Sequence, residues 1–171
     1  MLFRSHSRDG LTVVTASLTT ASLLGTRAVR TIATGGEVLR DELTTVGPIA
    51  VASLERYRFD IAVIGAAGLS ASWGITELTD AEAEVQRVAI GRAERVVALA
   101  DGSKIGAVTP SVVGPASAVQ TLVTDPSARR DELAALAALN VEIVLAGSSE
   151  SADATPSGHR RARRPVTTKG A

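Results

Sequence analysis

Short runs of apolar, mostly β-branched residues alternate along this chain with segments that have the residue spacing of a helix. Strands are expected where the apolar runs lie, over residues 11–15, 29–34, 59–64, 95–100, 118–123 and 141–146. Helices are expected between them, over residues 16–25, from Pro48 onward, over residues 80–93 and from Asp125 to Asn140. Strands that alternate with helices of about ten residues form βαβ units around a parallel sheet. The pattern therefore predicts an α/β fold with a layered, mostly parallel sheet.

The composition agrees with such a sheet and narrows the chemistry of the chain. Hydrophobic residues make up 45% of the sequence but aromatic residues only 2%, so the core must consist of Val, Leu, Ile and Ala. The absence of cysteine excludes disulfides and thiolate metal sites, and both histidines, His6 and His159, lie near the ends. Any catalysis would depend on carboxylates and Lys104, and we expect no metal or other cofactor.

Composition and charge divide the chain into three parts. Residues 1–10 are predicted to be a disordered leader, residues 11–147 the folded domain, and residues 148–171 a disordered basic tail. The part up to Gly147 carries 13 basic and 16 acidic groups, so it has no electrostatic footprint for DNA. The basic run at residues 160–164 is interpreted as a solvated tail in preference to a weak nucleic-acid contact.

The sequence contains no recognisable membrane or secretory segment. No apolar run approaches the roughly 20 residues that span a bilayer. Residues 1–10 lack the apolar core of a signal peptide. We therefore expect a cytoplasmic protein without a membrane partner.

The most informative motif is the run VALADGSKIG at residues 97–106. A buried strand ends there in Asp101, a turn of small residues and Lys104. Ligands of open α/β sheets bind beyond the carboxyl ends of the strands, and a lysine among free backbone N–H groups suits a phosphate or another small anion. A local pairing of Asp101 with Lys104 is the alternative interpretation.

Turns rich in glycine follow two other predicted strands. Gly35 and Gly36 are interpreted as a tight turn in preference to a ligand loop. The run GAAG at residues 65–68 is the better candidate for a ligand loop, although helix–strand packing explains it equally well. Residues 39–46 and 65–74 are expected to be loops. The sequence has neither a nucleotide P-loop nor a full GxGxxG motif.

Acidic residues surround the predicted start of the helix over residues 80–93, at Glu77, Asp80, Glu82 and Glu84. Capping of the helix by Asp80 and the helix dipole account for most of them. Arg87 lies three residues after Glu84, which predicts a surface ion pair.

Taken in order, these segments resemble the carboxy-terminal sensor domain of DeoR-type transcriptional regulators. The likeness extends from about residue 10 to residue 146. The matching blocks are VVTAS at 13–17, ATGGEVLR at 33–40, VGP at 46–48, IGAAGL at 64–69, GIT at 74–76, DAEAEVQR at 80–87 and LADGSKIG at 99–106.

The resemblance implies a regulator, usually a repressor, of bacterial sugar catabolism whose sensor domain binds a phosphorylated sugar. It also implies self-association into a homo-oligomer and a Rossmann-like fold similar to that of ribose-5-phosphate isomerase and glucosamine-6-phosphate deaminase. By this resemblance the ligand-binding residues are Thr15, Ala16, Ser17, Gly35, Gly36, Gly65, Ala66, Ala67, Gly68, Glu82 and Lys104.

The sequence departs from the family pattern at several points. The family binds DNA through an amino-terminal helix-turn-helix, and because none precedes Gly10 we do not expect this chain to bind an operator. Residues 1–10 show neither the family's first strand nor its Gly-Thr-Thr phosphate loop. Ala16 stands where relatives often carry Asn, and Ser70 where they often carry Asp, which removes side chains able to bond sugar hydroxyls.

Two alternatives to a sugar-phosphate sensor stay open at this point. A sugar-phosphate isomerase or deaminase would need a carboxylate base, for which Glu82 and Asp101 are the candidates. An oligomerisation module would need no ligand. The ordered series of blocks favours the sensor, and we predict that the chain is not an enzyme.

Overall fold

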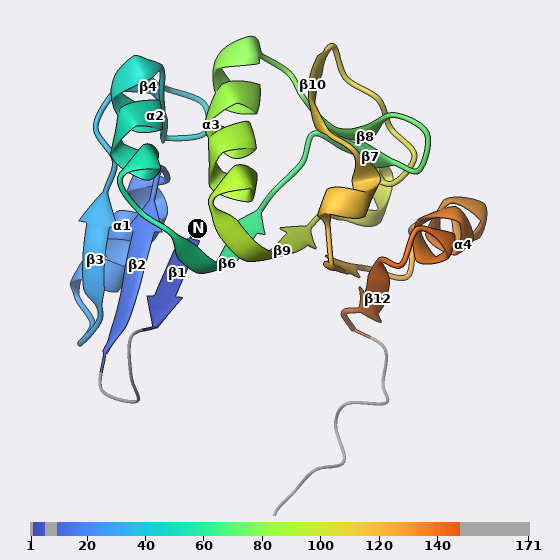
Figure 1. Ribbon diagram of the computed structural model, residues 1–171. Coiled ribbons are helices and arrows are strands. Elements are labelled where there is room, and N and C mark those ends of the chain that lie inside the picture. The colour runs from blue at the N-terminus through green and yellow to red at the C-terminus, as the bar shows by residue number, and fades with distance from the viewer. Residues whose placement is uncertain (1, 6–9, 148–171) are drawn as a thin grey trace, which may run out of the picture.

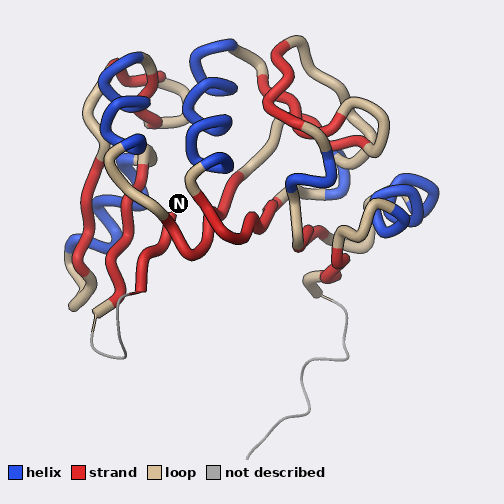
Figure 2. Tube along the Cα trace, viewed as in Figure 1, coloured by secondary structure: helices blue, strands red, loops and turns tan. Residues whose placement is uncertain are grey.

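A sheet of seven strands forms the centre of the computed structural model, which describes residues 2–5 and 10–147 (Figures 1 and 2). The strand order is β12-β11-β9-β6-β1-β2-β3. Neighbouring strands are parallel, except that β1 runs antiparallel to both β2 and β6. The predicted mostly parallel α/β fold is confirmed. The strands are β1 (Leu2–Ser5), β2 (Leu11–Thr15), β3 (Arg30–Ala33), β6 (Phe59–Ile64), β9 (Ala93–Leu99), β11 (Thr121–Thr124) and β12 (Glu142–Leu145).

Strand β1 corrects the prediction of a leader over residues 1–10. It pairs with β2 along its whole length, and Leu2 and Phe3 also pair with Ala62 and Ile61 of β6. Leu2–Ser5 therefore fills the place between β2 and β6 in the sheet. A strand of four residues whose second partner, β6, lies far along the chain has a weak local signature, which is why the sequence pattern missed it. Residues 6–9 and the predicted tail over residues 148–171 lie outside the described residues.

Four helices are found in the described part of the chain: α1 (Leu18–Gly25), α2 (Pro48–Glu55), α3 (Asp80–Gly91) and α4 (Arg130–Ala138). The predicted start of α2 at Pro48 is confirmed, because a proline in the first turn has a suitable φ and needs no N–H partner. Asn140, predicted to stop α4, adopts a φ of 66° just beyond the helix.

The predicted first residues of two helices, α3 and α4, differ from those in the structure. The N-cap of α3 is Thr79, whose hydroxyl accepts from the Glu82 N–H, and Asp80 is the first helical residue. Helix α4 begins at Arg130 and not at Asp125. The Asp125 carboxylate instead accepts from the backbone N–H groups of Ser127, at 2.8 Å, and Gly102, at 2.7 Å. Asp125 thus stabilises its own turn through Ser127 and links this turn by a hydrogen bond to Gly102, just beyond β9.

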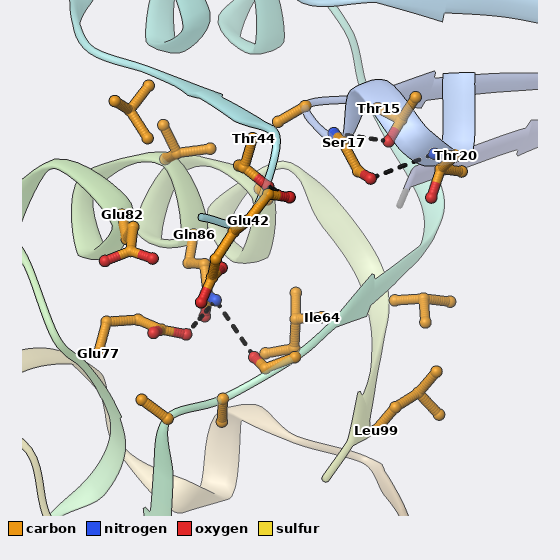
Figure 3. A pocket seen from close by; sticks show the side chains of 18 of the residues that line it. Thr15, Ser17, Thr20, Glu42, Thr44, Ile64, Glu77, Glu82, Gln86 and Leu99 are labelled. Carbon is orange, nitrogen blue, oxygen red and sulfur yellow. Dashed lines mark hydrogen bonds between the residues drawn. The ribbon is translucent and has the colours of Figure 1, made fainter. Parts of the chain in front are cut away.

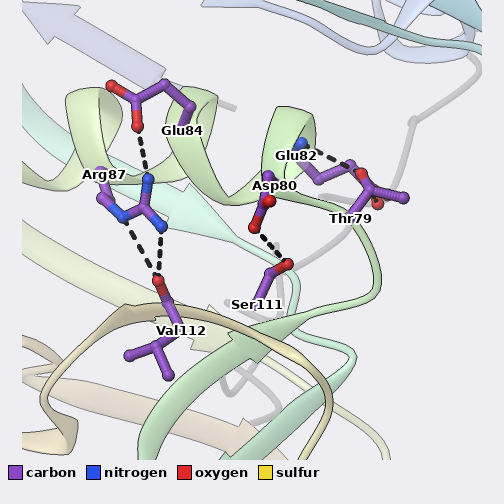
Figure 4. A network of polar contacts seen from close by, with 7 residues as sticks. All are labelled: Thr79, Asp80, Glu82, Glu84, Arg87, Ser111 and Val112. Atoms are coloured by element: carbon purple, nitrogen blue, oxygen red, sulfur yellow. Dashed lines mark hydrogen bonds and ion pairs between the residues drawn. The ribbon is translucent and has the colours of Figure 1, made fainter.

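The two predicted loops contain short antiparallel strands. Residues 39–46 belong to a hairpin, and residues 65–74 enter a small sheet of order β10-β8-β7. Arg87 of α3 donates two hydrogen bonds to the Val112 carbonyl, which ties this small sheet to the helix (Figure 4). The additional elements are β4 (Glu37–Leu39), β5 (Thr44–Val46), β7 (Gly68–Ser70), β8 (Gly74–Glu77), β10 (Ser111–Gly114) and the 3₁₀ turns η1 (Gly102–Lys104) and η2 (Ala116–Ala118).

The core is aliphatic, as the composition predicted, except that Phe59 of β6 is also buried in it. Helices α2 and α3 lie side by side over the sheet (Figure 1). Their buried faces include Leu54, Ala83 and Ala89, which belong to the same buried cluster as Ala62 and Ala98 of the sheet. Small residues on the strands allow the helices to approach closely, and this packing holds the carboxyl ends of β2, β6 and β9 in one region.

Candidate functional site

A cavity of about 420 Å³ lies beyond the carboxyl ends of β2, β6 and β9 (Figure 3). Its volume is in the range of small-molecule sites. Of the residues predicted to bind a ligand, Thr15, Ala16, Ser17, Gly65, Ala66, Ala67, Glu82 and Lys104 line it. The wall also contains polar residues that the prediction did not include: Thr20, Glu42, Thr44, Glu77, Gln86 and Asp101.

The turn between β2 and α1 forms the hydroxyl-rich side of this cavity. The Thr15 hydroxyl accepts from the Ser17 N–H at 3.1 Å, and the Ser17 hydroxyl caps α1 by accepting from the Thr20 N–H at 3.2 Å (Figure 3). The Leu18 N–H donates to the Leu43 carbonyl at 2.8 Å. Several amides at this helix start are therefore already bonded, and the hydroxyl groups remain as donors toward the cavity.

The β4–β5 hairpin closes the cavity beside this turn. The Thr45 N–H donates to the Ala16 carbonyl at 2.9 Å, and Ser17 and Thr44 form an isolated bridge. Leu43 has a φ of 49°, a conformation that branched side chains rarely adopt. This backbone turn places the Leu43 carbonyl against the start of α1 and leaves Glu42 on the cavity wall.

Gly65 marks the point where β6 opens into the cavity. A Cβ atom added to Gly65 would meet no atom within 4 Å, so neighbouring packing does not require a glycine there. Its carbonyl accepts from the Gln86 side-chain amide at 3.2 Å. Gly65 is exposed, and it is followed by Ala66 and Ala67. Because none of these three residues has a side-chain atom beyond Cβ, a ligand can approach their backbone.

Glu77, at the end of β8, is the most perturbed acid of this cavity. Its carboxylate accepts from the Gln86 amide at 2.5 Å, and its side chain lies near those of Glu82 and Glu42 (Figure 3). Burial, followed by repulsion from Glu82, raises the pKa of Glu77 to about 7, against the opposing effect of the Gln86 hydrogen bond. A buried carboxyl thus titrates near neutrality inside the cavity.

Glu82 has a structural role as well as a place on the cavity wall. It accepts from the Thr79 hydroxyl at 2.6 Å, while Thr79 accepts from the Glu82 N–H at 3.3 Å (Figure 4). Thr79 thus caps α3 in a variant of the capping box, in which the Glu82 carboxylate accepts from the cap hydroxyl and not from its backbone N–H. The predicted ion pair of Glu84 with Arg87 is also present, on the exposed side of α3. Asp80 accepts from the Ser111 hydroxyl at 2.7 Å.

The turn after β9 carries Asp101 and Lys104 to the cavity. Asp101 caps η1 by accepting from the Ser103 N–H at 2.9 Å, and the Ser103 hydroxyl also donates to it. These bonds lower the pKa of Asp101, so it is a poor general base. The local pairing of Asp101 with Lys104, considered as the alternative interpretation, is not formed: within the described residues Lys104 makes no ion pair with Asp101 or any other acid.

Three residues predicted from the family resemblance do not line this cavity. Gly36 has a φ of 127°, and a Cβ there would lie 2.4 Å from the Val46 carbonyl oxygen. Gly35 precedes it in the same turn, as the interpretation of a tight turn predicted. A Cβ on Gly68 would lie 2.5 Å from the Ala107 carbonyl oxygen, so Gly68 is required where two segments pack closely. Packing explains the glycines at positions 36 and 68.

Sequence reasoning missed Glu77 and Gln86 as cavity residues because they come from β8 and α3 and not from a parallel strand end. The one available signal was an acid, Glu77, at the end of the otherwise uncharged GIT block. Across the residues that the structure describes, no group of three His, Cys, Asp or Glu is placed to hold a metal ion. None of the helices in that part of the chain is long and apolar enough to cross a membrane.

Comparison with known proteins gives a consistent family. The model of the DeoR C terminal sensor domain matches residues 4–126. An HTH-type transcriptional regulator, GolR of Listeria innocua, is 30% identical over 70% of this chain and 48% of its own length. The HTH-type transcriptional repressor GlcR of Bacillus subtilis is 30% identical over 67% of this chain and 44% of its own.

A further relative is the putative aga operon transcriptional repressor of Escherichia coli O157:H7, which is 25% identical over 85% of this chain and 54% of its own length. The chain spans about half the length of these relatives. Because the family model covers most of the central sheet and every strand end at the cavity, the chain belongs to the DeoR C-terminal sensor domain family.

Proposed function

We propose that this sensor domain binds a phosphorylated sugar in the cavity beyond β2, β6 and β9, and that it controls a regulator of sugar catabolism. The observation that carries this proposal is the convergence of Thr15–Ser17, the Gly65 turn and Lys104 on one cavity of small-molecule size. Three strand ends that are far apart in the sequence contribute to it, as expected of ligand sites in open α/β sheets.

The chemistry of the wall supports a ligand with both an anionic group and hydroxyl groups. Lys104 and the hydroxyls of Thr15, Ser17 and Thr20 are donors suited to phosphate oxygens, whereas the Thr44 hydroxyl already donates to the Glu42 carbonyl. Carboxylates and backbone carbonyls on the same wall are acceptors suited to sugar hydroxyls. Such a division of donors and acceptors would orient a sugar phosphate in one direction.

Partners of the whole regulator are part of the same proposal. The relatives are named HTH-type regulators, so operator binding is assigned to a helix-turn-helix domain and not to residues 11–147. The sensor domain would form a homo-oligomer in the cytoplasm. An enzymatic role is not proposed, because Glu82 is engaged in a capping box and Asp101 caps a turn.

Thermal unfolding in the presence of triose, pentose and hexose phosphates tests this function. A ligand at a hundred times its dissociation constant adds about 2.7 kcal/mol to stability, which corresponds to a melting temperature raised by about 5–10 °C. Lys104→Gln should abolish most of this shift. Arg95→Gln is the matched control, because it removes one positive charge from an exposed residue of β9 that does not line the cavity.

Two results would contradict the proposal. One is the absence of any shift with every phosphorylated sugar of the three sizes. The other is an equal loss of the shift in Lys104→Gln and Arg95→Gln, since that would indicate a nonspecific effect of charge. Inclusion of the unphosphorylated sugars shows whether the phosphate itself is recognised.

A further inference from the structure

Acidic groups outnumber basic groups on the cavity wall. Four carboxylates line it, those of Glu42, Glu77, Glu82 and Asp101, against the single ammonium group of Lys104. A sugar phosphate brings about two further negative charges. Charges of one sign in a cavity with low-dielectric walls repel each other more strongly than in water. Glu42 and Asp101 are exposed, but Glu77 and Glu82 are buried, so a phosphate bound beside these two acids adds negative charge where only Lys104 supplies a positive one.

The acidic side of the cavity is also short of hydrogen-bond donors. Glu77 and Glu82 are 7% and 8% exposed as residues, and their carboxylates are held in place by Gln86 and Thr79 respectively. The Gln86 amide nitrogen donates to Glu77 and to the Gly65 carbonyl, which fixes the orientation of the amide. Its oxygen is consequently left buried without a donor among the described residues. An unmatched buried acceptor is costly unless a ligand supplies the donor.

The titration of Glu77 agrees with this lack of positive charge. The groups that face it are Glu82 and Gln86 of α3, Glu42 of the β4–β5 turn and the Ala67 amide, and none of them is a cation. Burial and the two neighbouring acids together raise the pKa of Glu77 to about 7. A cation placed among these groups would favour the ionised carboxylate and remove the conflict.

We propose that the ligand carries an ammonium group in addition to its phosphate, as an amino-sugar phosphate does, and that Glu77, Glu82 and the Gln86 oxygen bind this ammonium group. An ammonium group has three N–H donors, and these three acceptors match that number. Glu82 keeps free lone pairs beside its bond from Thr79, so capping and ligand binding are compatible. This inference rests on the proposed sugar-phosphate function and specifies the ligand class.

Paired ligands provide the test. Binding of glucosamine 6-phosphate, N-acetylglucosamine 6-phosphate and glucose 6-phosphate is measured by calorimetry at about pH 8, and the galacto and manno series are treated in the same way. Within the skeleton that binds, the free amine should bind at least about tenfold more tightly than the acetylated or hydroxyl forms, in line with a charge-assisted hydrogen bond. This preference should decrease toward pH 6, where Glu77 is protonated.

Variants assign the preference to the acidic side. Glu77→Gln and Glu82→Gln should each reduce the amine preference to less than about threefold, and because this preference is a ratio taken within one variant, it is independent of any change in overall sugar-phosphate affinity. Gln at position 82 keeps a capping box, so a folding defect is not expected. Glu84→Gln is the matched control, because Glu84 is on the same helix and exposed but outside the cavity. It should leave the preference unchanged.

The outcomes separate this inference from the proposed function. If neutral and acetylated sugar phosphates bind as tightly as the amines in every series, the ammonium inference is overturned while sugar-phosphate binding stands. If the amine preference survives in both Glu77→Gln and Glu82→Gln, the assigned binding site is wrong. If no phosphorylated compound binds, the proposed function and the inference both fail.

Discussion

Two glycine turns follow parallel strands of this sheet, at Gly35–Gly36 after β3 and at Gly65 after β6, and they have opposite roles. The turn at Gly36 is filled: its φ is positive and the Val46 carbonyl occupies the place of a side chain. The turn at Gly65 is open and lines the cavity together with Glu77 and Gln86. The same residue type after the same kind of element thus stabilises the fold in one case and leaves space in the other.

The same contrast extends to energetics. Around Gly36 the backbone and the helix α2 pack closely, and the Ala50 side chain lies 3.4 Å from the place that a Cβ atom on Gly36 would take. Around Gly65 a buried carboxyl with a pKa of about 7 and an acceptor without a donor oppose folding. Groups that destabilise a fold locally are frequent at ligand sites. We therefore expect substitutions at the first turn to destabilise the protein and neutralisation at the second to stabilise it.

The largest effect is expected at Gly36. Gly36→Ala should lower the free energy of unfolding by about 3 kcal/mol or more. The positive φ at this position is one that alanine rarely adopts, and its Cβ would clash with the Val46 carbonyl oxygen. Gly65→Ala should change it by less than about 1 kcal/mol. Urea denaturation of the two variants measures the difference. Equal destabilisation by both would remove the contrast between the turns.

Neutralisation of Glu77 should have the opposite sign. The carboxyl has a pKa of about 7 in the folded protein and 4.5 as its ordinary value, so its ionisation opposes folding. Stability is therefore unaffected below about pH 4.5 and is lost as the pH rises through about 7. At pH 8 the loss amounts to at most about 3 kcal/mol. Glu77→Gln should remove it and be the more stable protein there.

Denaturation of wild type and Glu77→Gln at pH 5 and at pH 8 measures this effect. The stability difference between the two proteins should grow with pH. Parallel pH profiles would show that Glu77 does not titrate in this range, and the destabilising role of the Gly65 side of the cavity would then be wrong.

A smaller effect is expected at the cap of α3. Thr79→Ala removes the hydroxyl that bonds both the Glu82 N–H and its carboxylate, and should lower stability by about 1 kcal/mol. It should also loosen Glu82 on the cavity wall and weaken ligand binding. Glu84→Gln, which breaks only the exposed pair with Arg87, should change stability by less than about 0.5 kcal/mol. Equal effects of the two changes would contradict the role of the capping box.

The spacing of apolar residues identified the elements of the fold that depend on their own local sequence. The runs at 59–64 and 95–100 correspond to β6 and β9, because a strand buried on both faces is a continuous apolar run in the sequence. Pro48 begins α2, because proline has a fixed φ that suits the first turn of a helix. Strands β7, β8 and β10 were missed because they are short and depend on partners elsewhere, as the pairing of Ser111 with Glu77 shows. Thr79 and Asp80 are both good capping residues, and spacing alone does not choose between them.

The candidate site divides in the same way. Thr15, Gly65 and Lys104 could be singled out because they follow strands whose carboxyl ends meet at one edge of the sheet. Glu77 and Gln86 reach the cavity from the small antiparallel sheet and from a helix face, which no local pattern places there. Residue context already favoured the run at 65–68 over Gly35–Gly36 as a ligand loop, while the family resemblance included both, and the close packing around Gly36 agrees with the residue context.

The backbone amide spectrum of the ¹⁵N-labelled protein, titrated with the sugar phosphate that raises the melting temperature most, tests the central claim most directly. The signals of Gly65, Ala66, Ala67 and Lys104 should shift and saturate together, while those of Gly35 and Gly36 stay in place. Shifts centred on Gly35 and Gly36, with the Gly65 and Lys104 signals unchanged, would contradict the assignment of the ligand to the open turn.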